Sequence, residues 1–265
     1  MRIALAQIIS TPDPAANAAL VERYCRDALD RGAELVIFPE ATMCAFGNPL
    51  PDVAEPLDGP WATRIRGIAE DLGITIVAGM FTPGPHGKVR NTLLVAGPDS
   101  DAHYDKIHLF DAFGYAESDT VEPGTRAVTF AAGGATIGLA TCYDVRFPAL
   151  FVANADKGAT ITIVCASWGA GAGKAEQWDL LVRARAVDST AYVLACDQGD
   201  PTTQGIELSG SAPTGIGRSA VVSPLGEVLH QLDGNEGLLV ADLDLDAVRD
   251  AREKLPVLAN RRDVA

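Results

Sequence analysis

Short apolar runs that are typical of buried strands alternate with helical patterns along most of the chain, and this alternation is what most constrains the fold. Expected strands cover residues 2–8, 34–38, 74–80, 91–96, 160–165 and 191–197, two more lie between residues 127 and 141, and hairpins are expected over residues 217–243. Expected helices cover residues 14–31, 60–72, 147–157, 174–189 and 245–253. No linker, repeat or low-complexity tract interrupts this order, so the sequence predicts a single α/β domain over residues 1–265 with a mixed sheet.

Size and charge limit the possible function classes. The chain has 265 residues, of which 48% are apolar, so a substantial core is expected and disorder is not. The net charge of −14 argues against nucleic acid and against anionic membrane surfaces as partners, because both attract basic patches. No apolar run reaches the roughly eighteen residues that a membrane-spanning helix needs.

The five cysteines and the first residues predict a cytoplasmic protein. The odd number and wide spacing of the cysteines give no disulfide framework and no zinc-binding motif, which suits a reducing compartment. The apolar run at residues 3–6 is too short for the core of a signal peptide. We expect Cys25, Cys165 and Cys196 in the core, whereas Cys44 is a candidate for lining a pocket.

Cys142 stands where an expected strand turns into an expected helix, and it is a candidate nucleophile. The N-terminus of a helix offers N–H groups and a positive dipole end, and both favour the reactive thiolate. The alternative is a small buried apolar side chain, which is the commoner situation for a cysteine after a strand. Two further segments bear on this choice.

Glu40 and Lys106 are candidates for proton transfer and for charge stabilisation. Glu40 follows the apolar strand and Pro39, at the carboxyl end of a strand, where open α/β folds place their chemistry. A carboxylate against apolar walls has a raised pKa and can act as a general base. Lys106 lies among aromatic and aliphatic residues, where a lysine can stabilise negative charge on a substrate oxygen. A surface acid and a solvated lysine are the alternatives.

Together, these segments resemble the carbon–nitrogen hydrolase (nitrilase) superfamily. The resemblance rests on Phe38-Pro39-Glu40, on Lys106-Ile107-His108-Leu109 and on Cys142-Tyr143-Asp144, the last followed by Arg146-Phe147-Pro148. Further matches at residues 166–168, 177–178, 183–186, 217–219 and 223–227 extend it over nearly the whole chain. The motifs at Lys106 and Cys142 are most similar to those of the Nit-type amidase branch.

This resemblance implies a fold, an activity and an assembly. The fold is an α-β-β-α sandwich of four layers. The activity is hydrolysis of a non-peptide carbon–nitrogen bond through a thioester on Cys142, with Glu40 as the base and with Lys106 and the N–H of Tyr143 as oxyanion donors. The assembly is a homodimer or a higher homo-oligomer, to which residues 166–177 and the C-terminal tail contribute. No metal or organic cofactor is implied.

Five further residues are assigned less directly. Glu117 matches the position of the family's second glutamate, which orients the lysine, and the alternative is a solvated loop acid. Arg146 is a candidate for holding a substrate carboxylate, or else a structural ion-pair partner of Asp144. Phe113 and Trp168 either line the pocket or belong to the core or an interface. Asp144 is expected to cap a helix rather than to act as a catalytic acid.

The sequence leaves the substrate open. The matched motifs favour an amidase that releases ammonia from a small carboxylate-bearing amide, as omega-amidase and deaminated-glutathione amidase do. An N-carbamoyl amino acid hydrolase or a nitrilase is the alternative within this chemistry, although Tyr143 and Asp144 disfavour a nitrilase, and a non-catalytic scaffold dimer is the alternative outside it. Gln177, where many relatives have His, and residues 111–116, which face the substrate in the family, depart from the branch.

Overall fold

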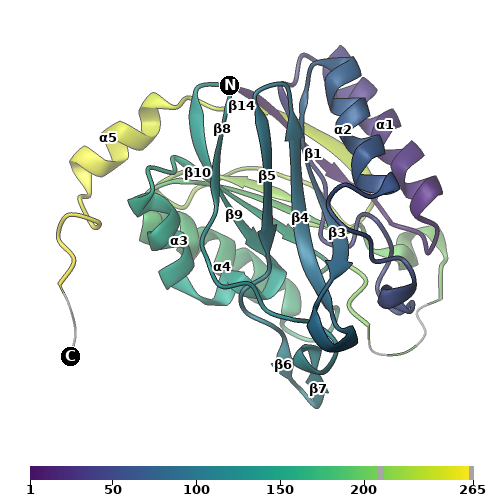
Figure 1. The fold of residues 1–265 in the computed structure, drawn as a ribbon. Helices are drawn as coiled ribbons and strands as arrows, with labels where there is room; N and C mark the ends of the chain where they lie inside the picture. Colours follow the sequence, from purple (N-terminus) through teal and green to yellow (C-terminus); the bar gives the residue numbers. More distant parts are fainter. Residues whose placement is uncertain (208–209, 211, 263–265) are drawn as a thin grey trace.

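Two six-stranded sheets lie face to face between layers of helices in the computed structural model, which describes residues 1–207, 210 and 212–262 (Figure 1). The first sheet has the order β14-β1-β2-β3-β4-β5, made of β1 (Arg2–Gln7), β2 (Leu35–Ile37), β3 (Thr75–Pro83), β4 (Val89–Gly97), β5 (Ser100–Asp105) and β14 (Gly237–Asp242). The second has the order β13-β12-β11-β10-β9-β8, made of β8 (Thr129–Ala132), β9 (Ala135–Thr141), β10 (Ile161–Ala166), β11 (Tyr192–Asp197), β12 (Ala220–Val222) and β13 (Val228–Gln231).

Helices cover the outer faces of both sheets. The helices are α1 (Pro14–Asp30), α2 (Pro60–Leu72), α3 (Pro148–Asp156), α4 (Lys174–Ser189) and α5 (Asp246–Lys254). In Figure 1, α1 and α2 lie against the first sheet and α3 and α4 against the second, while α5 extends away from the sheets. The order of layers is therefore α-β-β-α, and the predicted four-layer sandwich is confirmed.

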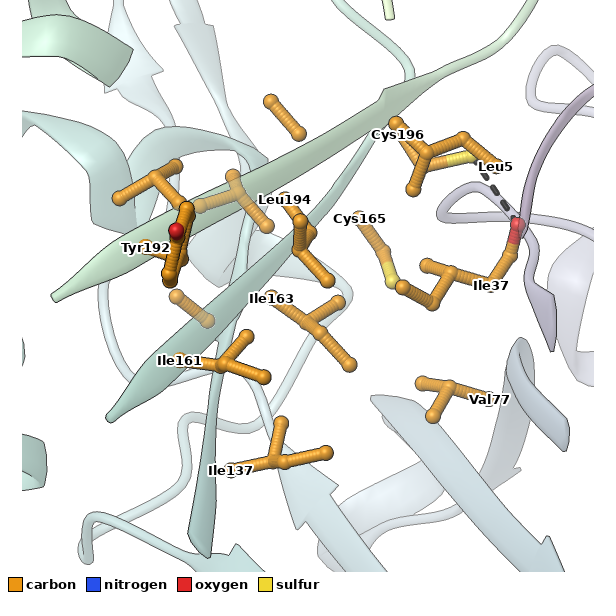
Figure 2. Close-up of a cluster of buried hydrophobic side chains, with 14 of the residues drawn as sticks. Leu5, Ile37, Val77, Ile137, Ile161, Ile163, Cys165, Tyr192, Leu194 and Cys196 are labelled. Atoms are coloured by element: carbon orange, nitrogen blue, oxygen red, sulfur yellow. Dashed lines mark hydrogen bonds between the residues drawn. The ribbon is translucent and has the colours of Figure 1, made fainter. Parts of the chain in front are cut away.

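The alternation of side chains along each strand produces these layers. In β1, Ile3 and Leu5 belong to the same buried cluster as Ile163 of β10, whereas Ala4 and Ala6 belong to the cluster that contains residues of α1 and α2. Because successive residues of a strand point to opposite faces, one strand contributes to both the core between the sheets and the core under the helices. Figure 2 shows the core between the sheets, where side chains of both sheets meet.

Local sequence signals explain where the helices begin and end. Helix α1 starts with Pro14, and the side chain of Asp13 accepts the N–H of Ala15 at 2.8 Å. Helix α2 starts with Pro60 and ends at Leu72, and Gly73 caps it with a φ of +64°, the left-handed conformation that favours glycine. The predicted helices are therefore confirmed at both positions.

Five short 3-10 turns and one small hairpin complete the described elements. The turns are η1 (Leu50–Asp52), η2 (Pro85–Gly87), η3 (Glu117–Asp119), η4 (Cys142–Arg146) and η5 (Pro201–Gln204), and the hairpin consists of β6 (Asp111–Ala112) and β7 (Tyr115–Ala116). The hairpin projects from one end of the sandwich (Figure 1). Within the described residues, no helix is both long enough and apolar enough to cross a membrane.

Two strands depart from the sequence prediction. The expectation of hairpins throughout residues 217–243 is wrong in part, because β12 and β13 do form one but β14 runs antiparallel to β1 in the other sheet. Spacing alone gave no information on which sheet would accept this strand. Strand β5 was not expected, because its sequence is mostly polar, as suits a strand at the edge of a sheet.

Candidate active site

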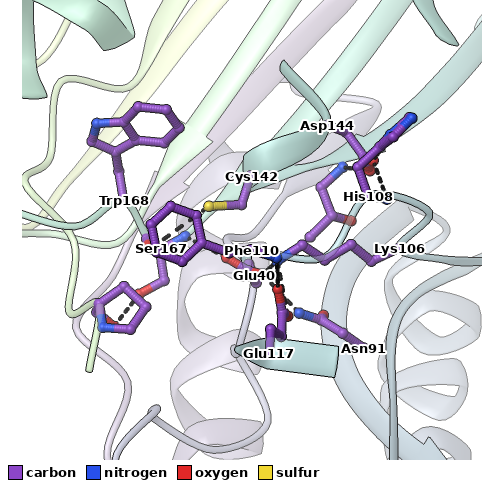
Figure 3. A network of polar contacts seen from close by, with 12 residues as sticks. Glu40, Asn91, Lys106, His108, Phe110, Glu117, Cys142, Asp144, Ser167 and Trp168 are labelled. Carbon is purple, nitrogen blue, oxygen red and sulfur yellow. Dashed lines mark hydrogen bonds and ion pairs between the residues drawn. The ribbon is translucent and has the colours of Figure 1, made fainter. Parts of the chain in front are cut away.

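Several strand ends converge on one pocket of about 310 Å³. Glu40 follows β2, Lys106 follows β5, Cys142 follows β9, and Ser167 follows β10. In α/β folds, chemistry gathers at the carboxyl ends of the strands, because neighbouring parallel strands end at the same edge. The three residues predicted from separate motifs therefore line the same cavity (Figure 3).

Glu40 is held in place by a close approach of two backbones. After Pro39 the chain bends, and Ala41 has a φ of +58°. The N–H of Gly79 in β3 donates to the carbonyl of Pro39 at 3.2 Å, and a Cβ at position 79 would lie 2.9 Å from the Cα of Glu40. Glycine is therefore required there for the bend to lie against the sheet.

The side chain of Glu40 is 1% exposed and fully hydrogen-bonded. Its Oε1 accepts Asn91 Nδ2 at 2.7 Å and Lys106 Nζ at 3.1 Å, and its Oε2 accepts the N–H of Ser167 at 2.9 Å. Burial raises the pKa of Glu40 above its ordinary value, although the charge of Lys106 opposes this shift. The alternative of a surface acid is therefore wrong.

Lys106 lies between two carboxylates. Its ammonium is 2.9 Å from both oxygens of Glu117 in addition to its contact with Glu40, and its side chain is 3% exposed. Burial lowers the pKa of Lys106, but Glu40 and Glu117 outweigh burial and raise that pKa well above its ordinary value. The ammonium therefore stays charged, and the alternative of a solvated lysine is wrong.

Glu117 is buried rather than a solvated loop acid. It begins the turn η3 after β7, and its Oε2 also accepts the N–H of Phe110 at 2.6 Å. This bond ties the segment that follows Lys106 to the same carboxylate that binds the ammonium. The geometry agrees with the predicted role of Glu117 in orienting Lys106.

Cys142 is the first residue of η4, and its φ of +46° is unusual for a residue with a side chain. Asp144 supports this turn, since its Oδ2 accepts the N–H of Thr141 at 2.8 Å as part of a capping box. The prediction that Asp144 is a cap is confirmed. The Cys142 Sγ lies 3.9 Å from the carbonyl oxygen of Ser167, and both residues line the pocket.

The helix N-terminus that was expected to favour the thiolate form of Cys142 does not lie at this residue. The turn η4 is a short 3-10 turn, and the longer helix α3 begins only at Pro148, so no helix N-terminus lies at the sulfur. Burial, and next to it the negative charge of Glu40, raise the pKa of Cys142 well above its ordinary value, while Lys106 opposes them. The thiol is therefore protonated at neutral pH, and nucleophilic attack needs a base.

The four other predicted pocket residues all line the cavity: Tyr143, Arg146, Phe113 and Trp168. Phe113 is 86% exposed at the tip of the β6–β7 hairpin, so its alternative as a core residue is wrong. Trp168 is both a pocket residue and a core residue, because it is 3% exposed and packs against Trp178 with 5.2 Å between ring centroids.

Arg146 does not form the structural ion pair that was its alternative role. Its Nη2 donates to Gln177 Oε1 at 2.7 Å, and its guanidinium lies 5.2 Å from the ring centre of Trp168. Asp144 is instead fully buried and accepts the hydroxyl of Tyr104 at 2.6 Å. Arg146 is therefore available to a molecule in the pocket.

Sequence reasoning missed five residues that shape the site: Asn91, Phe110, Ser167, Lys174 and Asp197. Asp197 has the clearest signal, because it is an acid at the carboxyl end of the buried, apolar strand β11. Its Oδ1 accepts the N–H of Trp168 at 2.7 Å and its Oδ2 accepts the N–H of Ile216 at 2.9 Å, and burial raises its pKa to about 8. The predicted core positions of Cys25, Cys165 and Cys196 are confirmed, whereas Cys44 is buried away from this pocket.

Known proteins match the chain over nearly its whole length. The sequence model of the carbon-nitrogen hydrolase family matches residues 2–253. A hydrolase of Mycobacterium tuberculosis is 55% identical over 99% of this chain and 96% of its own length, and the omega-amidase NIT2 of Homo sapiens is 31% identical over 98% and 95%. A mutant of the amidase from Nesterenkonia sp. AN1, which shows the result of Michael addition of acrylamide at its active-site cysteine, is 30% identical with a TM-score of 0.78 over 97% of this chain and 98% of that chain.

The four-layer sandwich and these matches define a hydrolase of the nitrilase superfamily. Within that superfamily, the chain belongs to the carbon-nitrogen hydrolase family, in its Nit-type branch.

Proposed function

We propose that the protein hydrolyses small amides through a thioester on Cys142, with Glu40 as the general base and Lys106 as the cation that stabilises the oxyanion. The observation that carries this proposal is the shared pocket, in which a protonated thiol, a carboxylate of raised pKa and a permanently charged ammonium meet. Such a set supplies the nucleophile, the base and the electrostatic stabilisation that acyl transfer needs. The relatives named as amidases support the same chemistry.

The first half of the reaction forms the thioester. Glu40 accepts the proton of the Cys142 thiol while the sulfur attacks the amide carbonyl carbon, so a C–S bond forms and the carbonyl electrons move onto oxygen. Lys106 and the backbone N–H of Tyr143 stabilise this oxyanion. The C–N bond then breaks, Glu40 returns its proton to the nitrogen, and ammonia leaves.

The second half regenerates the thiol. Water replaces ammonia, Glu40 takes one of its protons, and the oxygen attacks the thioester carbon. The C–S bond breaks, the sulfur recovers the proton from Glu40, and the carboxylic acid leaves. Lys106 keeps its proton throughout, as its raised pKa requires.

The substrate class in this proposal is an amide that also carries a carboxylate. Arg146 lines the pocket and has Gln177 as its hydrogen-bonding partner, so its guanidinium can still bind an anion. The pocket wall is otherwise rich in aromatic rings, which suits a short carbon chain between the amide and the carboxylate. The similarity to an omega-amidase agrees with this class.

Ammonia release from a panel of amides tests the proposal. The panel contains an oxo-acid amide, deaminated glutathione, a simple aliphatic amide, an N-carbamoyl amino acid and a nitrile. We expect the wild type and a Cys44→Ala control to hydrolyse at least one amide, and Cys142→Ala to hydrolyse none while keeping the wild-type circular dichroism spectrum. Cleavage that survives in Cys142→Ala means that the nucleophile is a different residue. If only the N-carbamoyl amino acid is hydrolysed, the protein is a carbamoyl hydrolase and not an amidase.

A further inference from the structure

A third cation, which the proposed function does not use, lies in the same pocket beside Lys106 and Arg146. Lys174 is the first residue of α4, and its ammonium lies 4.7 Å from the ring centre of Phe113, 5.6 Å from that of Phe110 and 6.0 Å from that of Trp168. The indole N–H of Trp168 donates to the carbonyl of Lys174 at 2.9 Å, which fixes the start of the helix against the pocket wall.

Lys174 has no carboxylate partner within the described part of the chain. Its ammonium makes no hydrogen bond or ion pair there, although the chain has 35 acidic residues. The two acids of the pocket, Glu40 and Glu117, are both bound to Lys106. A positive charge of the pocket wall is therefore left without a carboxylate partner among the described residues, on a protein of net charge −14.

Arg146 adds a second uncompensated charge to the same place. Both Lys174 and Arg146 face Trp168, and burial together with the charge of Arg146 lowers the pKa of Lys174. Two cations held close together repel one another, which raises the electrostatic energy of the site unless an anion lies between them. The rings of Phe110, Phe113 and Trp168 lie within about 6 Å of one or both cations and provide apolar surface beside the place where such an anion would bind.

We propose that Lys174 is a specificity-determining residue that binds, together with Arg146, an anionic group at the far end of the acyl chain. The substrate class is then a short linear chain with a carboxamide at one end and a carboxylate or similar oxyanion at the other. The carboxamide lies at Cys142, and the methylene groups lie against Phe110 and Trp168. This inference rests on the proposed function and assigns the substrate selectivity of its pocket to a residue outside the reacting set.

Kinetics on a matched trio of amides tests the role of Lys174. The trio is glutaramate, neutral pentanamide and cationic 5-aminopentanamide, which share a five-carbon chain. We expect Lys174→Met to raise the KM for glutaramate about tenfold or more, with little change in kcat, and to leave kcat/KM for pentanamide within about twofold. Lys157→Met, which removes an exposed charge at the end of α3, serves as the control and should change neither. Lys174→Glu should turn the preference toward 5-aminopentanamide.

Two results would overturn this inference while leaving the proposed amide hydrolysis through Cys142, Glu40 and Lys106 intact. One is a wild type that prefers pentanamide to glutaramate. The other is an equal loss of kcat/KM for both amides in Lys174→Met, which indicates that Lys174 only supports the fold of the hairpin through Phe113.

Calorimetric titration of glutarate tests the anion site independently of turnover. Glutarate is expected to bind Cys142→Ala, and at least about tenfold more weakly when Lys174→Met is added. Equal affinities of the two proteins for glutarate contradict the inference, whether or not any variant hydrolyses an amide. If glutarate binds as expected but the wild type hydrolyses no amide, the proposed function is contradicted instead.

Discussion

Glu40 and Lys106 form a buried ion pair, with 3.1 Å between Oε1 and Nζ and with side chains that are 1% and 3% exposed. Glu117 shares the same ammonium at 2.9 Å, so the network of three groups carries one net negative charge away from water. Removing one member of a buried ionic network leaves an uncompensated buried charge, which lowers the stability of the folded protein. The network therefore fixes the position of the Lys106 ammonium, and in the proposed mechanism it leaves Glu40 as the proton acceptor.

Replacing Glu40 by Gln should remove the base and keep the shape of the site. The amide oxygen can still accept Lys106 or Asn91, but it cannot take the proton of Cys142. We expect kcat for amide hydrolysis to fall by about a hundredfold or more. Steady-state ammonia release measures this, with the exposed Glu70→Gln as the control. Comparable rates in the two variants would show that another group deprotonates the thiol.

The activity of the wild type should fall on the acidic side at a pH above the ordinary value of 4.5 for a glutamate. Burial raises the pKa of Glu40, and only its ionised form is a base, so kcat/KM should decrease as the pH is lowered through that raised value. A pH–rate profile between about pH 4 and 9 measures the midpoint. Full activity down to pH 4.5 disagrees with Glu40 as the base.

Glu117→Gln should shift this acidic limb. The negative charge of Glu117 is one of the causes that raise the pKa of Glu40, so removing it should move the midpoint of kcat/KM to lower pH. The amide oxygen can still accept the N–H of Phe110, which keeps the segment in place. Asp119→Asn changes an exposed acid of the same turn and should leave the midpoint unchanged. If the midpoint does not shift in Glu117→Gln, the charge of Glu117 does not raise the pKa of Glu40.

Asp144 should matter for stability more than for chemistry. It is fully buried and accepts the N–H of Thr141, the N–H of His108 at 2.9 Å and the hydroxyl of Tyr104. Asp144→Ala leaves these three donors unpaired, so we expect the free energy of unfolding to fall by about 3 kcal/mol or more. Tyr104→Phe removes only one donor and should cost about 1 kcal/mol. Urea unfolding compares them, and similar losses in both variants would contradict this ranking.

The stability of the wild type should decrease as the pH rises toward about 8 because of Asp197. Its pKa is about 8 in the folded protein against an ordinary 3.8, so the folded state binds more protons in this window. The contribution is fully present below the ordinary value and is lost as the pH rises through about 8, with a slope of up to about 1.4 kcal/mol per pH unit. Asp197→Asn cannot ionise, so its unfolding free energy should decline less between pH 5 and pH 8. Parallel declines in both proteins would exclude Asp197 as the cause.

The strands and helices whose buried apolar residues recur at regular spacing along the sequence were predictable. Ile65 and Ile68 in α2, and the run from Leu35 to Phe38, gave their elements directly. Strand β5 was not predictable, because its polar residues suit an edge that only pairing with β4 defines. The sheet that accepts β14 was not predictable either, since an apolar strand fits either sheet.

The candidate site divides in the same way. Glu40 and Cys142 were found because each follows an expected strand, Lys106 because its segment resembles a motif of the family, and Glu117 because it matches the position of the family's second glutamate. Lys174 and Asp197 were missed. Lys174 follows a glycine-rich stretch with no motif of its own, and Asp197 gains its role from backbone N–H groups of distant segments.

The sequence by itself determined the α/β class, most strand and helix positions and the candidate residues Glu40, Lys106 and Cys142 that share one pocket, because these depend on motifs and spacing along the chain. Only the tertiary structure decided the ionisation of the site. The turn at Cys142 was expected to favour the thiolate, but burial and then the charge of Glu40, which folding brings from the other sheet, raise the pKa of Cys142 and favour the thiol. It likewise decided that Arg146 faces the pocket while Asp144 is enclosed by Tyr104, because neighbours along a turn point in different directions once the turn is packed.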